Sequence, residues 1–337
     1  MIVIGTAYAD YLEVRRSADI YIEPNRNSDI IEKTAPGTYL NLIEDLKTNG
    51  YYHVRAVSLG QPGWIYKTYV RRHSGDIPKQ VSETGTIDIL AETTSVLTPE
   101  QRSYAARHLR LGKPQAVYER VREGYVLAQD ARLKIPLWVQ YELSREDLRG
   151  DVERSDDFRP DTSIPFGSRA ELSDYRGSGF DRGHMAPAAD MKRNQRTMSE
   201  SFLLSNMSPQ VGVGFNRDIW ADLEAAVRGW VEQRGTLTII MGPVFAVKEG
   251  MVTYRVIGGN YVAVPTHFYK IIVDANNPKS IEALAFLIPN ENLSGHHYSE
   301  FLVSIDEIEA ATGLNFLSVL PVSIQNSVES QKAVSIW

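Results

Sequence analysis

The chain has 337 residues and a formal net charge of −6, with 43% hydrophobic and 23% charged residues. This composition is ordinary for a globular protein and excludes collagen-like, mucin-like and strongly disordered classes. The chain contains no cysteine, which excludes disulfides, thiolate metal sites and cysteine nucleophiles. The length is sufficient for two domains, one small and one large.

Apolar runs in this sequence are too short to cross a bilayer. Two of the longest, 237–240 and 283–288, are far below the roughly 20 residues that a membrane-spanning helix needs. The first nine residues lack a basic leader before an apolar stretch, so no secretory signal is predicted. Together with the absence of cysteine, these features predict a cytoplasmic protein without a membrane partner.

Residues 1–73 alternate short apolar strands with turn residues such as Asn49-Gly50, which predicts a small all-β barrel. The segment resembles bacterial Src-homology-3-like modules through Leu12-Glu13-Val14-Arg15 and Gly63-Trp64-Ile65. Such modules bind wall fragments, peptides or proteins, so the resemblance implies a docking element for a protein partner or regulator. An alternative remains open, in which the tryptophan and the tyrosines simply fill a small core.

Residues 74–97 are polar, contain glycine and proline, and predict a linker. Thr98-Pro99-Glu100 then matches a helix start, with a capping hydroxyl followed by proline. From residue 98 to 337 the chain alternates strands and helices without a break, which predicts a mixed α+β domain. We expect strands at 124–128, 137–141, 237–241, 261–264, 267–273 and 283–288, and helices at 218–233 and 303–312.

The segment Asp181-Arg182-Gly183-His184 follows two further glycines, Gly177 and Gly179. Glycines in such density break regular structure and let a ligand approach the backbone. An imidazole after this turn is placed to act as a general base, because its ordinary pKa lies near neutral pH. For a single histidine, a core or surface position remains an alternative.

A second candidate group follows at Asn216, Glu224 and Arg228. If Asn216 opens a helix, Glu224 lies about 12 Å further along the axis. Amide oxygens are among the hard ligands that Mg²⁺ prefers. In the alternative interpretation, Asn216 is a helix cap and Glu224–Arg228 is an ordinary ion pair one turn apart.

Taken together, these segments resemble the DNA/RNA non-specific endonucleases of the ββα-metal (His-Me finger) class, which includes endonuclease G. The resemblance covers about Leu109 to Pro321 and implies an endonuclease domain that hydrolyses DNA and RNA with little sequence preference. Its fold would be α+β, with mixed and antiparallel sheets, preceded by the small barrel. The matching residues are Asp181–His184, Ser205–Gln210, Asn216, Trp220, Leu223-Glu224 and Arg228.

The resemblance also implies a role for each site residue. His184 would deprotonate the attacking water, and Asn216 would be the direct protein ligand of one Mg²⁺, with Mn²⁺ as a substitute. Glu224 would orient a metal-bound water, and Asn206 would brace the loop near the histidine and the phosphate. An upstream arginine would offset charge on the phosphorus. The candidate arginines are Arg154, which we favour over Arg159 for that role, together with Arg182 and Arg228.

Local charge can differ from the acidic total. Five basic residues lie between positions 176 and 196, so a patch that steers nucleic acid is possible there. These basic residues are Arg176, Arg182, Lys192, Arg193 and Arg196.

Two other function classes remain open. The second domain could be a catalytically degenerate scaffold that acts as an interaction protein through the barrel, or a phosphodiesterase for small substrates. A non-specific nuclease without an export signal would be toxic to its own cell. We therefore expect a regulated intracellular effector, for instance in antiviral defence or cell suicide. Relatives of this class are often dimers, so a homodimer is a further expectation.

Overall fold

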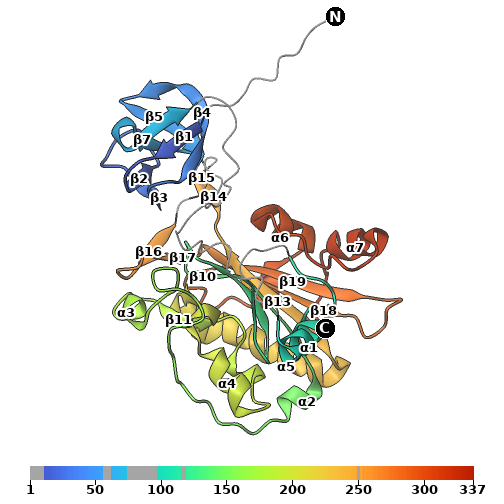
Figure 1. Cartoon of the computed structure of the whole chain (residues 1–337). Helices are drawn as coiled ribbons and strands as arrows, with labels where there is room; N and C mark the ends of the chain where they lie inside the picture. Colours follow the sequence, from blue (N-terminus) through green and yellow to red (C-terminus); the bar gives the residue numbers. More distant parts are fainter. Residues whose placement is uncertain (1–10, 56–61, 74–96, 115–118, 249–250, 253) are drawn as a thin grey trace, which may run out of the picture. The chain divides into compact units, whose positions relative to one another are not determined.

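The computed structural model describes the chain except for residues 1–10, 56–61, 74–96, 115–118, 249–250 and 253. The chain forms two compact units (Figure 1). One comprises residues 1–89 with 247–253, and the other comprises 90–246 with 254–337. The predicted linker lies outside the described residues apart from Leu97, and the predicted domain boundaries stay a prediction.

The N-terminal unit is all-β, as its turn-rich sequence predicts. Strands β1 to β7 form one antiparallel sheet in the order β3-β2-β6-β5-β4-β1-β7, and β14 (Val247–Lys248) pairs separately with β15 (Met251–Val252). Asn49 and Gly50 both take positive φ, 53° and 84°, which is the geometry of a tight hairpin turn between β4 and β5. Whether this unit is a Src-homology-3-like module stays a prediction. The strands are β1 (Tyr11–Val14), β2 (Ala18–Tyr21), β3 (Ile30–Thr34), β4 (Tyr39–Thr48), β5 (Tyr51–Arg55), β6 (Pro62–Tyr66) and β7 (Val70–His73).

A seven-stranded antiparallel sheet organises the second unit, in the order β20-β19-β18-β13-β10-β9-β8. Most of the strands predicted from the apolar runs are found here, several of them longer than expected. The strands are β8 (Glu119–Val121), β9 (Val126–Asp130), β10 (Ile135–Leu143), β13 (Leu237–Val244), β18 (His267–Asp274), β19 (Glu282–Pro289) and β20 (Leu302–Val303).

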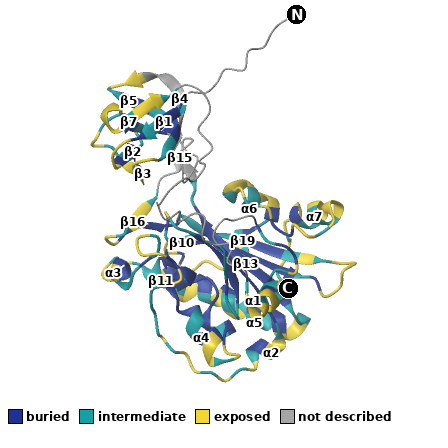
Figure 2. Cartoon of the chain, viewed as in Figure 1, coloured by how far each residue is buried: buried dark blue, intermediate teal, exposed yellow. Residues whose placement is uncertain are grey.

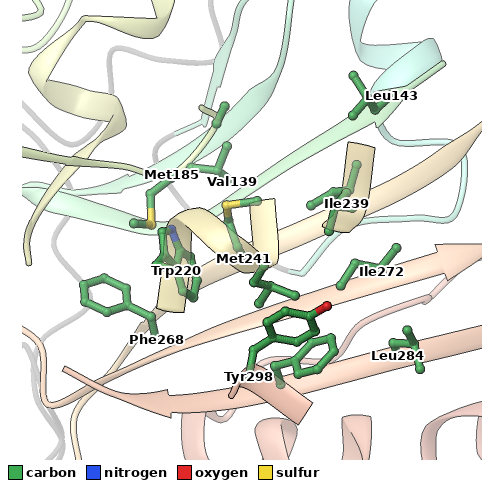
Figure 3. Close-up of a cluster of buried hydrophobic side chains, with 14 of the residues drawn as sticks. Val139, Leu143, Met185, Trp220, Ile239, Met241, Phe268, Ile272, Leu284 and Tyr298 are labelled. Carbon is green, nitrogen blue, oxygen red and sulfur yellow. The ribbon is translucent and has the colours of Figure 1, made fainter. Parts of the chain in front are cut away.

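Successive residues of this sheet enter two different cores, because side chains of a strand alternate between its faces. On β13, Ile239 and Met241 pack with Trp220 of α5 (Trp220–Arg234). Figure 3 shows this cluster. Ile240 joins the opposite core with Ile308 of α6 (Ile305–Thr312). The sheet is therefore buried on both faces over its central strands (Figure 2).

Helix termini follow the local signals in the sequence. α1 (Pro99–His108) begins with a capping box in which Thr98 Oγ1 accepts from the Gln101 amide at 3.2 Å. α6 ends at Gly313, whose φ of 71° is left-handed. Both predicted helix boundaries are thus confirmed. Among the described residues, no helix has the length and apolar character needed to cross a membrane.

A hairpin followed by a helix lies against one face of the sheet. β11 (Asp181–His184) pairs antiparallel with β12 (Met207–Gln210), so that His184 lies opposite Met207. An irregular helical turn (Gly212–Ile219) then leads into α5, with Gly214 at φ 84°. Asn216 therefore lies on this turn instead of opening a regular helix. The connecting and peripheral elements are α2 (Arg145–Leu148), α3 (Leu172–Tyr175), α4 (Gln195–Ser201), β14 (Val247–Lys248), β15 (Met251–Val252), β16 (Arg255–Ile257), β17 (Val262–Val264) and α7 (Val322–Glu329).

Candidate active site

A cleft of about 720 Å³ opens where β11, α5 and the segment after α2 meet. Four of the predicted site residues and the predicted metal ligand line it. Asn206 and Arg228 are not among its lining residues. The cleft is lined by Arg154, Phe158, Leu172, Tyr175, Arg176, Phe180, Asp181, Arg182, His184, Pro187, Ala188, Ala189, Asn216 and Glu224.

His184 is held by two aromatic rings at the end of β11. Its imidazole packs edge-on against Phe158 and Phe202, with ring centroids 5.6 and 4.9 Å away. Nε2 is fully covered and has no hydrogen-bond partner among the described residues. Nδ1 is therefore the nitrogen through which the ring can reach the cleft. The two rings fix the orientation of the imidazole by packing. In many other catalytic histidines a hydrogen bond to a carboxylate has this role.

Burial sets the protonation state of this ring. It lowers the pKa of His184 from 6.5 to about 3, and the positive charges of Arg154 and Arg182 act in the same direction. The imidazole is neutral at pH 7 and has a lone pair available for a proton. A bound phosphate would bring negative charge and raise this pKa, which makes the ring a stronger base in the complex.

Two guanidinium groups flank the histidine by stacking on its aromatic neighbours. Arg182 lies 4.0 Å from the centroid of Phe158, and Arg154 lies 4.8 Å from that of Phe202. Arg154 also pairs with Asp156 at 2.6 Å on the exposed side. Both cations are thus placed beside the imidazole, where an anionic phosphate would lie.

The two candidates for the upstream arginine differ in position. Arg154 lines the cleft. Arg159 donates to Asp157 Oδ2 at 2.6 Å and to the Ser199 carbonyl at 3.0 Å, and it is not among the cleft residues. These contacts favour Arg154 for a phosphate contact.

Asn206 supports the histidine from behind. It is fully buried, and its Oδ1 accepts from the Ala186 amide at 2.9 Å. Its Nδ2 donates to the carbonyls of Ala186 and Ser201, each at 2.8 Å. These bonds agree with the predicted role of Asn206 as a brace for the loop that carries His184. Because the side chain is buried and does not line the cleft, it supports the site without touching a phosphate there.

Asn216 is oriented by an acidic residue of the same motif as His184. Asp181 Oδ2 accepts from Asn216 Nδ2 at 2.9 Å. The same carboxylate accepts twice from Arg217, at 2.7 and 2.6 Å. Because the amide nitrogen is engaged by Asp181, the amide oxygen is left for another ligand. Arg217 and Asn216 also lower the pKa of Asp181, so this acceptor stays ionised.

Glu224 lies on the first turns of α5, above a buried lysine. Lys270 Nζ is 3.9 Å from Glu224 Oε1 and 4.3 Å from the centre of the Trp220 ring. Lys270 is only 1% exposed. Burial raises the pKa of Glu224, and the charge of Lys270 opposes this rise. The lysine thus favours the ionised carboxylate that a cation site needs.

Arg228 belongs to the support of the site and not to the cleft. Its Nη1 donates to the buried Asp190 at 3.0 Å, and Asp190 also accepts from the Tyr141 hydroxyl at 2.7 Å. The alternative interpretation, a simple Glu224–Arg228 pair, is not what the structure shows. Instead, Glu224 lies next to Lys270, and Arg228 forms an ion pair with Asp190.

Several of these neighbours were missed by the sequence prediction. Asp181 was part of the recognised motif but had no assigned role. Lys270 carried a usable signal, since it is a charged residue inside the apolar strand sequence 267–273. Phe158 and Phe202 carried none, because their contact with His184 depends on packing between distant segments.

The chain is similar to known nucleases over most of its second unit. A model of the DNA/RNA non-specific endonuclease family matches residues 105–323. "Mitochondrial nuclease" of Saccharomyces cerevisiae is 35% identical over 283 residues, covering 79% of this chain and 85% of that protein. "Endonuclease G, mitochondrial" of Homo sapiens is 40% identical over 215 residues, covering 62% and 72%. A solved structure of the EndoG/EndoGI complex has a TM-score of 0.62 at 36% identity, covering 67% of this chain and 94% of that one.

Proposed function

The chain belongs to the DNA/RNA non-specific endonuclease family, and we propose that it hydrolyses phosphodiester bonds in the cleft that His184 and Asn216 line. The observation that carries the proposal is the convergence of two separate elements. β11 supplies the neutral imidazole, and the turn before α5 supplies an amide oxygen that its own neighbours leave free. A general base and a ligand for a divalent cation in one cleft suit metal-assisted phosphodiester hydrolysis.

His184 takes the proton from the attacking water through Nδ1. A positioned general base contributes roughly 10²- to 10⁴-fold in rate. Phosphate ester hydrolysis without a catalyst is among the slowest known reactions, so electrostatic stabilisation has to supply the larger share. Arg182 and Arg154 lie beside the imidazole and offset the charge that builds up on the phosphorus.

The family is metal-dependent, and the donors in the cleft suit a hard divalent cation. Asn216 and Glu224 offer oxygen ligands, and the described part of the cleft contains no sulfur ligand. Oxygen donors favour Mg²⁺, which keeps several waters of its own. We infer Mg²⁺ as the ion, with Mn²⁺ as a substitute, Asn216 as its direct ligand and Glu224 as the group that orients one of its waters. When bound, such an ion would stabilise charge on the leaving oxygen.

Low sequence preference follows from the same site. The residues assigned to chemistry address the phosphate and its charge, and contacts to the backbone carry no sequence information. Both DNA and RNA are therefore expected substrates. Preferences among them would come from strand shape.

Cleavage assays on single- and double-stranded DNA and RNA, with and without EDTA, test the proposal. The intact protein should cut all four polymers, EDTA should abolish cutting, and His184→Ala should slow it by about 10²- to 10⁴-fold. Absence of cleavage in the intact protein with added Mg²⁺ would support the degenerate scaffold. Activity on a small diester that is insensitive to salt, without polymer cleavage, would support the small-substrate phosphodiesterase, since binding to a polymer weakens with salt.

We further propose that residues 1–73 form a docking module for a partner that controls the nuclease, as in a regulated effector. One structural neighbour was solved as the EndoG/EndoGI complex, which describes inhibition of that relative by a protein. Deleting residues 1–72 should preserve cleavage of free DNA and change toxicity in cells. Unchanged toxicity would leave the module without this role.

A homodimer and a cytoplasmic location stay predictions. Two relatives are mitochondrial by name, and they do not support the cytoplasmic placement.

A further inference from the structure

One wall of the cleft is made of residues that the proposed chemistry does not use. Leu172, Tyr175, Arg176 and Phe180 line the cleft together with His184. They belong to α3 and to the loop that joins α3 to β11. The volume of about 720 Å³ lies within the roughly 300–1,000 Å³ of sites that enclose a drug-sized ligand. A single phosphodiester group fills only part of such a space.

Arg176 is an unengaged cation on this wall. It is exposed and forms no ion pair or side-chain hydrogen bond among the described residues. By contrast, Arg154 is paired with Asp156 and Arg217 with Asp181. A guanidinium without a carboxylate partner is free to bind a phosphate by two parallel hydrogen bonds.

The loop that carries Arg176 is ordered by its own bonds and open on its surface. Ser178 Oγ donates to the Tyr175 carbonyl at 2.9 Å and accepts from the Phe180 amide at 3.2 Å. Gly177 and Gly179 take φ of 70° and 85°, and a Cβ on either would meet no atom within 4 Å. The glycines therefore serve the turn and leave space above it for a ligand.

A second hairpin holds this wall in place and adds another cation. Asp174 of α3 accepts from the Asn260 backbone amide at 3.1 Å and from its Nδ2 at 3.0 Å. Asn260 lies in the turn between β16 and β17. The same hairpin places the exposed Arg255 over the Phe180 ring, 5.1 Å from its centroid. Cation and aromatic ring thus form one surface on connected elements.

We propose that Arg176, Phe180 and Arg255 form a subsite for the nucleotide next to the scissile bond. The arginines bind the neighbouring phosphodiester, and the aromatic ring packs against the base or the sugar. The proposal rests on the proposed function, because it assigns the same cleft a longer single strand of DNA or RNA as its ligand. Phosphates recur along every strand, and stacking accepts any base, so the subsite adds affinity without sequence preference.

Tyr175 completes the apolar part of this wall. The Tyr175 hydroxyl is buried and has no hydrogen-bond partner among the described residues, although the side chain lines the cleft. Because this hydroxyl is covered, Tyr175 contributes the edge of its ring to the wall and not its oxygen.

Binding without turnover tests the subsite directly. In full-length protein carrying His184→Ala and kept in EDTA, the affinity for a fluorescent ten-nucleotide oligo(dT) is measured over a range of salt. Arg176→Ala should weaken binding about tenfold, and the slope of log affinity against log salt should decrease by about 0.7 in magnitude for one lost phosphate contact. Phe180→Ala should weaken binding with little change of slope, because it removes stacking and no charge.

The matched control is Arg149→Ala, which removes an exposed arginine that does not line the cleft. It should leave both affinity and slope unchanged. If Arg176→Ala behaves like Arg149→Ala, the subsite is overturned.

Turnover by otherwise unmodified protein separates the subsite from the reaction centre. Arg176→Ala should lower kcat/KM on the ten-nucleotide strand about tenfold and leave the rate on bis(p-nitrophenyl) phosphate unchanged, since this diester has no neighbouring nucleotide. An equal loss on both substrates would place Arg176 in the reaction centre and contradict the subsite. If the intact protein cleaves neither substrate, the proposed function fails, while the binding measurement still decides on the subsite.

Discussion

At the scale of single residues, the chemistry of His184 depends on neighbours from other segments. Phe158 and Phe202 bury the ring, and this burial lowers its pKa and keeps it neutral. The two flanking arginines lower the pKa further. Sequence identified the histidine by its motif. It did not identify the rings, because no periodicity or spacing relates positions 158 and 202 to position 184.

Asp181 acts through Asn216, and a substitution can expose this. Asp181→Asn leaves one neutral acceptor oxygen in place of the two charged oxygens that Asn216 and Arg217 share. Arg217 then competes for that oxygen, and the Asn216 amide loses its fixed orientation. We expect the Mg²⁺ concentration for half-maximal cleavage to rise about 10- to 100-fold, as is typical when a supporting group of a metal ligand is lost. A titration of cleavage rate against Mg²⁺ measures it.

The matched control is Asp222→Asn, an exposed acid on α5. Its half-maximal Mg²⁺ concentration should equal that of the unmodified protein. If Asp181→Asn and Asp222→Asn needed the same Mg²⁺ concentration for half-maximal cleavage, Asp181 would not be the residue that orients Asn216.

At the scale of elements, α5 is fixed on the sheet by both apolar and charged contacts. Leu223 and Val227 of α5 enter the core that Figure 3 draws, and Lys270 of β18 lies beneath Glu224. Apolar periodicity predicted the helix and the strand. The sequence did not reveal their charged contact, because the partners are 46 positions apart and only the packing of α5 on β18 joins them.

Lys270→Met tests this contact as a source of stability. The substitution keeps an unbranched apolar chain of similar length and leaves Glu224 without its buried cation. Loss of one partner of a buried ion pair costs about 3 to 5 kcal/mol. We expect a decrease of this order in the free energy of unfolding, measured by urea denaturation of the full-length chain.

Lys279→Met is the control, since Lys279 is an exposed lysine between β18 and β19. It should change the free energy of unfolding by less than about 0.5 kcal/mol. Similar losses in both variants would show that Lys270 contributes no specific pairing.

At the scale of the whole molecule, the buried His108 makes the free energy of unfolding depend on pH. His108 is 1% exposed; its Nε2 donates to the Glu123 carbonyl at 2.8 Å, and its Nδ1 accepts from the Glu142 amide at 3.1 Å. Burial lowers its pKa from 6.5 to about 4. The unfolded chain therefore takes up this proton first as the pH falls, and the free energy of unfolding decreases between pH 6.5 and 4.

His108→Gln removes this titration and keeps an amide that can donate and accept. Relative to the unmodified protein, the variant should lose about 3 kcal/mol less of its free energy of unfolding between pH 6.5 and 4. Urea denaturation at several pH values measures the difference, with the exposed His296→Gln as control. Parallel pH profiles for His108→Gln and the unmodified protein would contradict the assignment.

The sequence predicted more of the architecture than of the site. Strand runs such as 267–273 and the capped start of α1 at Thr98 are local signals, and local signals fixed the α+β class. The motif predicted Asn206 as a brace but not which groups it holds. Its bonds to Ala186 and to Ser201 at the end of α4 join the segments on either side of that helix, and no local signal in the sequence relates these positions.

The most direct test of the account compares His184→Ala with Asn216→Ala in cleavage rate and in Mg²⁺ binding by calorimetry. We predict that His184→Ala loses about 10²- to 10⁴-fold in rate and binds Mg²⁺ as the unmodified protein does. Asn216→Ala should lose Mg²⁺ affinity and recover part of its rate as Mg²⁺ is raised. Near-normal cleavage by His184→Ala, or unchanged Mg²⁺ binding by Asn216→Ala, would contradict the account.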